Sequence, residues 1–146
     1  MKRRHILFPI LVLAAACSSR GGSSPTPASQ SPGPALVVER FLAAANANEL
    51  ETMTQLFGTS DRTIVELEGR TRAEERMYVL ASLLRHNDWT IRGQRTVPGR
   101  ITDATELVVE LQKPERAVTV PILVVRRERG GWIIERIDVE ELTRSG

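Results

Sequence analysis

Three polar side chains in the second half of the chain have the types that acid–base catalysis uses. His86 and Asp88 are two residues apart, and Tyr78 is the only tyrosine. A histidine beside a carboxylate can take a proton from a substrate, and a position at the end of a helix favours its charged form. The same residues also fit a polar turn between a helix and a strand. Both interpretations stay open at this level.

Other common catalytic and metal-binding patterns are missing from the sequence. His86 is the one histidine outside the N-terminal segment, and Cys17 is the only cysteine, so no Cys/His set for zinc is present. The carboxylates lack the spacing of a calcium loop. No glycine-rich phosphate loop, zinc-protease motif or Gly-x-Ser-x-Gly elbow occurs. We therefore expect neither a metal site nor a bound cofactor.

The N-terminus has the layout of a signal peptide. Three basic residues at positions 2–4 precede an apolar run over 6–16, which is shorter than the roughly 20 residues that cross a bilayer. The run ends in Leu-Ala-Ala-Ala before Cys17, which resembles the lipobox of bacterial lipoproteins, with alanine at position 14 where leucine is usual. The resemblance implies acylation of Cys17, and Ser18 in place of aspartate favours the periplasmic face of the outer membrane. The alternative is an ordinary secretory signal with a chance cysteine.

Composition divides the rest of the chain. Thirteen of the seventeen residues in 18–34 are Gly, Pro or Ser, a composition that predicts a disordered tether. We expect a signal peptide over 1–16, the acylated cysteine and tether over 17–34, and one domain over 35–146.

Without the three basic residues of the signal, the chain has 17 basic and 18 acidic residues, a formal charge of −1. That balance gives no general attraction for nucleic acid.

The first half of the domain has helical periodicity. Two sets of apolar residues recur at the spacing of one helix face: Val38, Phe41, Leu42 and Ala45, and then Ala73, Met77, Leu80, Ala81 and Leu84. A short helix between them is predicted to begin at a capping box of Asn48 and Glu51, and the last helix at one of Thr71 and Glu74. Residues 63–67 fit either a strand or a turn.

The second half alternates as strands do. Four stretches, 89–97, 105–111, 118–125 and 132–137, place apolar residues at every second position over much of their length. Gly93 predicts a bulge, and Pro121 predicts a bulge or an edge position. Gly130-Gly131 predicts a tight hairpin turn. Helices followed by antiparallel hairpins indicate an α+β protein, in which Trp132 or Ile134 should contact the helices.

Two stretches resemble nuclear transport factor 2-like domains. The first is 37–57, with its Phe-Leu-Ala-Ala run at 41–44 and its Met-Thr-Gln-Leu-Phe ending, and the second is Gly-Gly-Trp-Ile-Ile at 130–134. The resemblance implies a curved antiparallel sheet wrapped around helices as a cone with an apolar pocket. Ketosteroid-isomerase-like members use a tyrosine and an aspartate as an oxyanion hole. No second carboxylate matches their pattern here, so no catalytic residue is carried over.

These features predict a membrane-anchored lipoprotein of the bacterial cell envelope. Its domain is expected to bind a small apolar ligand or an envelope protein without catalysis. The alternative is an isomerase-like or dehydratase-like enzyme whose pocket contains His86, Asp88 or Tyr78. The expected partners are the lipid bilayer, through acylated Cys17, and a second copy of the chain, through the sheet.

Overall fold

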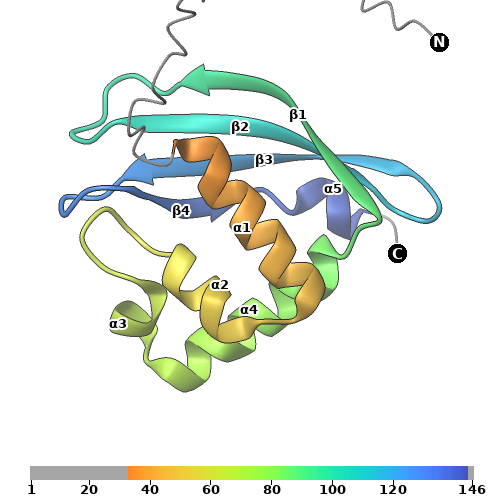
Figure 1. Cartoon of the computed structure of the whole chain (residues 1–146), viewed down its shortest axis with the longest axis horizontal. Coiled ribbons are helices and arrows are strands. Elements are labelled where there is room, and N and C mark those ends of the chain that lie inside the picture. The colour runs from red at the N-terminus through yellow and green to blue at the C-terminus, as the bar shows by residue number, and fades with distance from the viewer. Residues whose placement is uncertain (1–32, 145–146) are drawn as a thin grey trace, which may run out of the picture.

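Helices and one antiparallel sheet make up the computed structural model, which describes residues 33–144 (Figure 1). The helices are α1 (Pro34–Ala47), α2 (Leu50–Leu56), α3 (Ile64–Glu68), α4 (Arg70–Leu84) and α5 (Glu140–Thr143). The strands are β1 (Asp88–Thr96), β2 (Ala104–Gln112), β3 (Ala117–Arg126) and β4 (Trp132–Ile137). The predicted α+β class is confirmed. The predicted signal peptide, Cys17 and the tether up to residue 32 lie outside the described residues.

The four strands form an open meander in the order β1-β2-β3-β4. The register slips between Ile91 and Gly93, so the predicted bulge is confirmed. Pro121 lies one residue beyond the last β3–β4 pair, Ile122 with Ile137. Its missing N–H therefore removes no bond from that ladder, and its carbonyl accepts the Asp138 N–H at 2.9 Å. The predicted bulge or edge position of this proline is not confirmed, because β3 is an inner strand and its register slips between Leu123 and Val124; the pairing with β4 ends beside Pro121.

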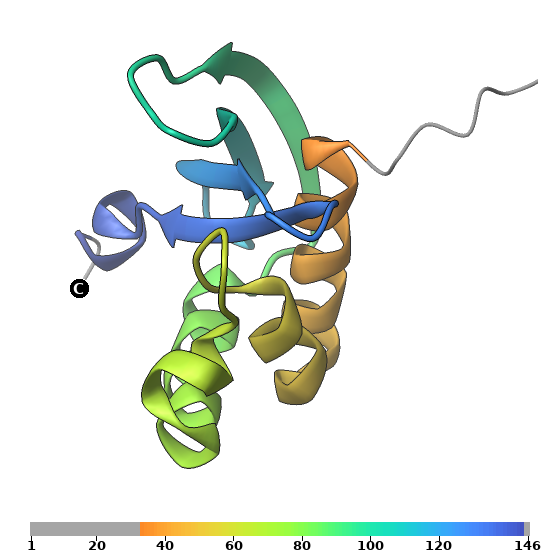
Figure 2. The same ribbon diagram turned by 90° about the vertical axis from the view of Figure 1, so that its left-hand side faces the viewer.

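Helices α1–α4 gather on one side of the sheet, and the main core lies between them and its inner face (Figure 2). The predicted apolar positions of α1 and α4 are buried except Leu80, which is half-buried, and the alternating inward residues of β2 and β3 are buried as well. Phe41 and Phe57 are in contact, with ring centres 6.1 Å apart. Ile134 is buried in this core, and its carbonyl accepts the Gly58 N–H at 2.9 Å. The predicted contact of β4 with the helical half is confirmed.

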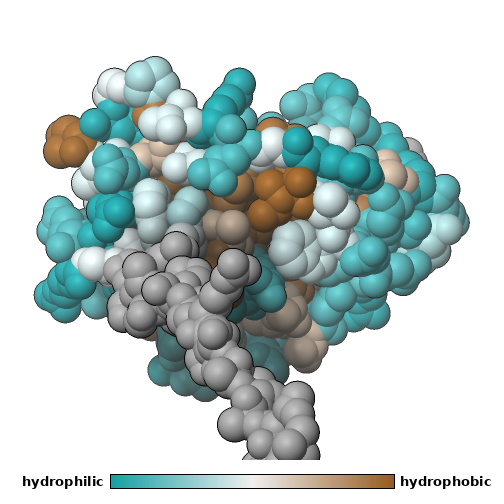
Figure 3. All heavy atoms as spheres, turned by 45° about the horizontal axis from the view of Figure 1, so that its top comes forward, coloured by the Kyte–Doolittle hydropathy of each residue, from teal (hydrophilic) through white to brown (hydrophobic). Residues whose placement is uncertain are grey.

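A smaller apolar cluster covers part of the outer face of the sheet. Ala104, Leu123, Val125 and Ile133 form it, and Val97 of the β1–β2 loop packs on top. Arg100 of the same loop donates to both carboxylate oxygens of Glu135 on β4, at 2.6 and 2.7 Å. When the top of Figure 1 is tilted toward the viewer, the surface is mostly hydrophilic, with hydrophobic residues gathered near its centre (Figure 3).

The predicted helix starts are wrong at two places. Asn48 is left-handed, with φ 57°, and its N–H bonds back to the Ala45 carbonyl at 3.2 Å. It therefore ends α1, and its left-handed backbone differs from the extended one that a helix-starting residue adopts, so Glu49 directly precedes α2 instead. α4 begins at Arg70 after Gly69, so Thr71 lies inside it.

The capping box lies instead in the segment whose structure the sequence left open. Thr63 donates its N–H and its hydroxyl to Glu66 Oε2, at 2.6 and 3.0 Å, at the start of α3. These two bonds favour the carboxylate and lower the pKa of Glu66. Within the part of the chain that the structure describes, no helix is long and apolar enough to cross a membrane.

Candidate ligand-binding site

His86 is held by the protein's own groups. It is buried, with 8% of its surface exposed, at the link between α4 and β1. Its Nδ1 lies 2.8 Å from the Leu84 carbonyl, which can only accept, so Nδ1 carries the proton. Its Nε2 then accepts the Asn46 side-chain amide at 3.2 Å. Both ring nitrogens are therefore hydrogen-bonded within the protein, which agrees with a polar turn between α4 and β1.

Tyr78 and Asp88 make no hydrogen bond to this ring. Tyr78 is on α4 with 57% of its surface exposed, beside Leu50 and Thr71 in a shallow groove. Asp88 is exposed at the start of β1, and its side chain accepts the Trp89 N–H at 2.8 Å. No hydrogen bond among residues 33–144 joins any two of the three predicted residues, so the structure does not assemble them into one site.

Acidic and histidine side chains do not gather elsewhere either. Within the described residues there is no group of three or more His, Cys, Asp or Glu side chains that could hold a metal ion. The carboxylates of the outer face are paired with arginines instead, as in Arg92–Glu110 at 2.6 Å and Arg95–Glu106 at 2.7 Å. Cys17, the predicted acylation site, lies outside the described residues.

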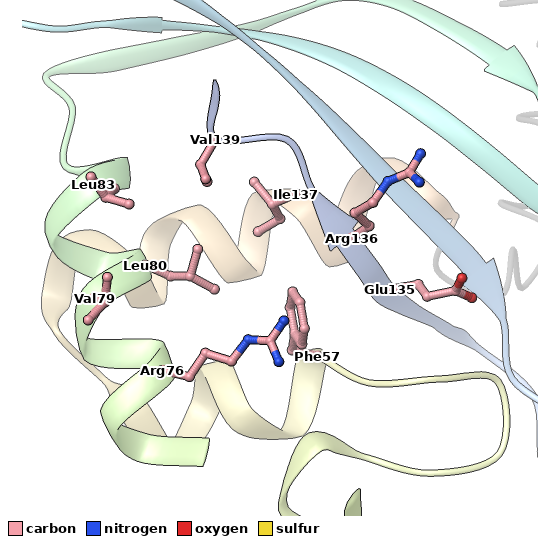
Figure 4. Close-up of a pocket in the computed structure, with 9 residues that line it drawn as sticks. All are labelled: Phe57, Arg76, Val79, Leu80, Leu83, Glu135, Arg136, Ile137 and Val139. Atoms are coloured by element: carbon pink, nitrogen blue, oxygen red, sulfur yellow. The ribbon is translucent and has the colours of Figure 1, made fainter. Parts of the chain in front are cut away.

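A cavity of about 390 Å³ lies between α4 and the end of β4. Its walls are mostly aliphatic or aromatic (Figure 4). The lining residues are Phe57, Arg76, Val79, Leu80, Leu83, Glu135, Arg136, Ile137 and Val139. The volume falls within the range of roughly 300–1,000 Å³ that small-molecule sites occupy. This half-open hollow is more enclosed than the larger ones of about 460 Å³ beside Arg95 and about 490 Å³ beside Arg40, and we take it as the candidate site.

Helical spacing places one wall of the cavity. Arg76, Leu80 and Leu83 lie at i, i+4 and i+7, which puts them on one face of α4. The opposite wall comes from Ile137, the last residue of β4, and from Val139, which directly precedes α5. Leu80 and Ile137 point toward one another across the space (Figure 4). The apolar part of the cavity is therefore made by two segments far apart in the sequence.

The ends of both walls are fixed by polar contacts. Lys113 Nζ donates to the Leu83 carbonyl at 2.6 Å and so caps the last turn of α4. Burial lowers the pKa of Lys113, and the nearby Arg116 lowers it further. Arg116 also donates to the Glu141 carbonyl at 2.8 Å, which ties α5 to the β2–β3 turn just beyond Val139.

Arg76 supplies the charge of the cavity. Its guanidinium lies 5.4 Å from the centre of the Phe57 ring, a cation–π contact, and donates to Glu68 Oε1 at 2.6 Å. Glu135 and Arg136 line the cavity near its edge, but their charged ends point away from it (Figure 4). The site therefore combines an aliphatic channel with one cationic group at the Phe57 end.

Comparisons with known proteins give no relative for this chain. No family model matches it, and neither a curated protein nor a solved structure does so. What the domain does must therefore be argued from its own geometry.

Sequence reasoning missed this cavity. The sequence did contain one indication of it on α4. Val79 and Leu83 are apolar but lie off the helix face that buries Met77 and Ala81, and Val79 is 57% exposed. An apolar residue beyond the core stripe of a helix indicates a second apolar contact. The residues across the cavity could not be identified, because only the fold brings β4 next to α4.

Proposed function

We propose that this protein is a lipid-anchored envelope protein whose domain binds a small apolar ligand in the cavity between α4 and β4. The single observation that carries the binding proposal is the cavity itself. It offers about 390 Å³ of space with mostly apolar walls. Such space is costly to leave hydrated and gains free energy when an apolar group fills it.

The anchoring part of the proposal rests on the sequence. The basic start, the short apolar run and the residues before Cys17 have the order of a lipoprotein signal. Several acyl chains on one cysteine would hold the chain at a bilayer, where one chain alone binds only marginally. The outer membrane is the proposed location, because Ser18 stands where retained proteins often carry aspartate.

A reduced form of the nuclear transport factor 2-like fold is part of the proposal. Its support is the order of helices before an antiparallel meander, together with an apolar cavity on the helical side of the sheet. The open, four-stranded sheet is the departure from a cone. A likeness of fold alone does not determine an activity.

The test uses a neutral fluorescent probe, N-phenyl-1-naphthylamine, and the chain from residue 18 onward, which keeps both apolar clusters of the fold. We expect saturable probe fluorescence with the wild-type chain. Leu83→Trp, which fills the cavity, should abolish it. Leu67→Trp is the matched control, because Leu67 is 39% exposed on α3, outside the cavity.

Urea unfolding of each variant establishes that it is folded before its probe binding is compared. If Leu83→Trp is folded and still binds the probe like the wild type, the cavity is not the binding site. If the wild-type chain gives no saturable fluorescence at all, the proposal of an apolar ligand site fails.

A further inference from the structure

We infer that the ligand of this cavity is a single-headed anionic amphiphile, with a carboxylate at Arg76 and a linear apolar tail that runs toward Leu83. The inference rests on the proposed function, and it adds the chemical class of the ligand. It is carried by the polarity of the channel, which has one charged group at one end and aliphatic side chains along the rest.

The channel has a direction because its lining follows one helix face. Arg76 and Leu83 are seven residues apart on α4, which at 1.5 Å per residue separates them by about 10 Å along the axis. Leu80 lies between them, and Ile137 faces it from β4. A ligand that follows this line meets a charge first and only aliphatic groups afterwards.

The guanidinium of Arg76 is held in place before a ligand arrives. The Phe57 ring lies against it at 5.4 Å, and Glu68 accepts one hydrogen bond from Nη1 at 2.6 Å. An arginine has five N–H donors, and within the described residues no other hydrogen bond uses them. The remaining donors are available at the mouth of the apolar channel.

A carboxylate accepts stronger hydrogen bonds from those donors than a neutral head group does. Hydrogen bonds between two charged groups are roughly twice as strong as those between neutral groups. The planar fork of arginine also matches the two oxygens of a carboxylate. Glu68 opposes an anion by like charge, which makes a second, independent prediction about its removal.

The experiment measures displacement of the neutral probe by octanoate and by 1-octanol, which share a tail and differ in the head. For the wild-type chain from residue 18 onward, octanoate should displace the probe at a concentration about tenfold lower than 1-octanol. Arg76→Met keeps the length of the side chain and should remove this difference. Arg72→Met is the matched control, because Arg72 is exposed on α4, one turn before Arg76 and outside the cavity lining, and it should keep the difference.

Glu68→Gln provides the second readout. It keeps an acceptor for Arg76 and removes the negative charge, so it should strengthen displacement by octanoate and leave 1-octanol unchanged. A purely structural role of Glu68 would alter both competitors alike.

The possible failures are distinguishable. Equal displacement by octanoate and 1-octanol, or an unchanged preference in Arg76→Met, overturns the anionic class while the apolar site stands. Loss of the preference in Arg72→Met shows attraction by general charge and also overturns the role of Arg76. Absence of probe binding by the wild-type chain refutes the proposed function itself.

Discussion

Removal of the Asn46 side chain should destabilise the domain by detaching α1 from the link between α4 and β1. Asn46 makes three contacts with His86, forty residues later in the chain. Its Nδ2 donates to the His86 carbonyl at 3.0 Å and to Nε2 at 3.2 Å, and its Oδ1 accepts the His86 N–H at 3.2 Å. Asn46→Ala deletes all three contacts at once.

The magnitude follows from these contacts. At about 1 kcal/mol of net stability for each hydrogen bond, their loss would cost roughly 3 kcal/mol. Asn46 itself is exposed, so in the variant water can form some of the hydrogen bonds that Asn46 makes to His86. We therefore expect Asn46→Ala to lower the free energy of unfolding by roughly 2 kcal/mol, a sizeable part of the typical total of about 5–15 kcal/mol.

The assay is urea unfolding of the chain from residue 18 onward, with Asn87→Ala as the control. Asn87 is exposed beside His86, and its bond to the Gln112 carbonyl comes from the main chain and survives the substitution. In both variants the free energy of unfolding should fall with urea concentration at the wild-type slope. The urea concentration at the midpoint of unfolding should be lower for Asn46→Ala than for Asn87→Ala. A loss in Asn46→Ala below about 0.5 kcal/mol, equal to that of Asn87→Ala, would refute the role given to this contact.

Two further predictions concern the anchor and the capping box. Cys17→Ala should leave the chain out of the membrane fraction while its domain still folds, as detergent partitioning and urea unfolding would measure; wild-type partitioning of the variant would exclude Cys17 as the anchor. Glu66→Gln keeps an acceptor for Thr63 but cannot ionise. Because the folded-state pKa of Glu66 lies below its ordinary value of 4.5, its stabilisation is present above that value and lost as the pH falls through the folded pKa. The wild-type chain should therefore lose more stability than Glu66→Gln from about pH 6 to about pH 3, and equal losses would contradict the capping box.

Periodicity predicted the parts of the fold that depend on burying one face. Phe41 and Leu42 on α1, and Met77 on α4, are buried as their spacing predicted. Gly93 was also located correctly at a bulge, because a residue without a side chain fits the local kink of the strand. These features depend on residues near in sequence.

Features that depend on a choice between two local roles could not be predicted. Asn48 fits the start of a helix and equally the left-handed end of one, and in the structure it takes the left-handed backbone and ends α1. The sequence likewise allowed two interpretations of His86, as a catalytic base or as part of a polar turn. Only the fold places the Asn46 amide on the His86 ring, because the two residues are far apart in the chain.

The most direct test of the account is the position of bound octanoate, measured by isotope-filtered NOEs between the ligand and the methyl groups of the isotope-labelled chain. We predict NOEs from the terminal methyl group of octanoate to Leu83 and Val139, and none from it to Leu50, which lies in the exposed groove beside Tyr78. NOEs to Leu50 without any to Leu83 or Val139 would contradict the central claim that the cavity between α4 and β4 is the ligand site.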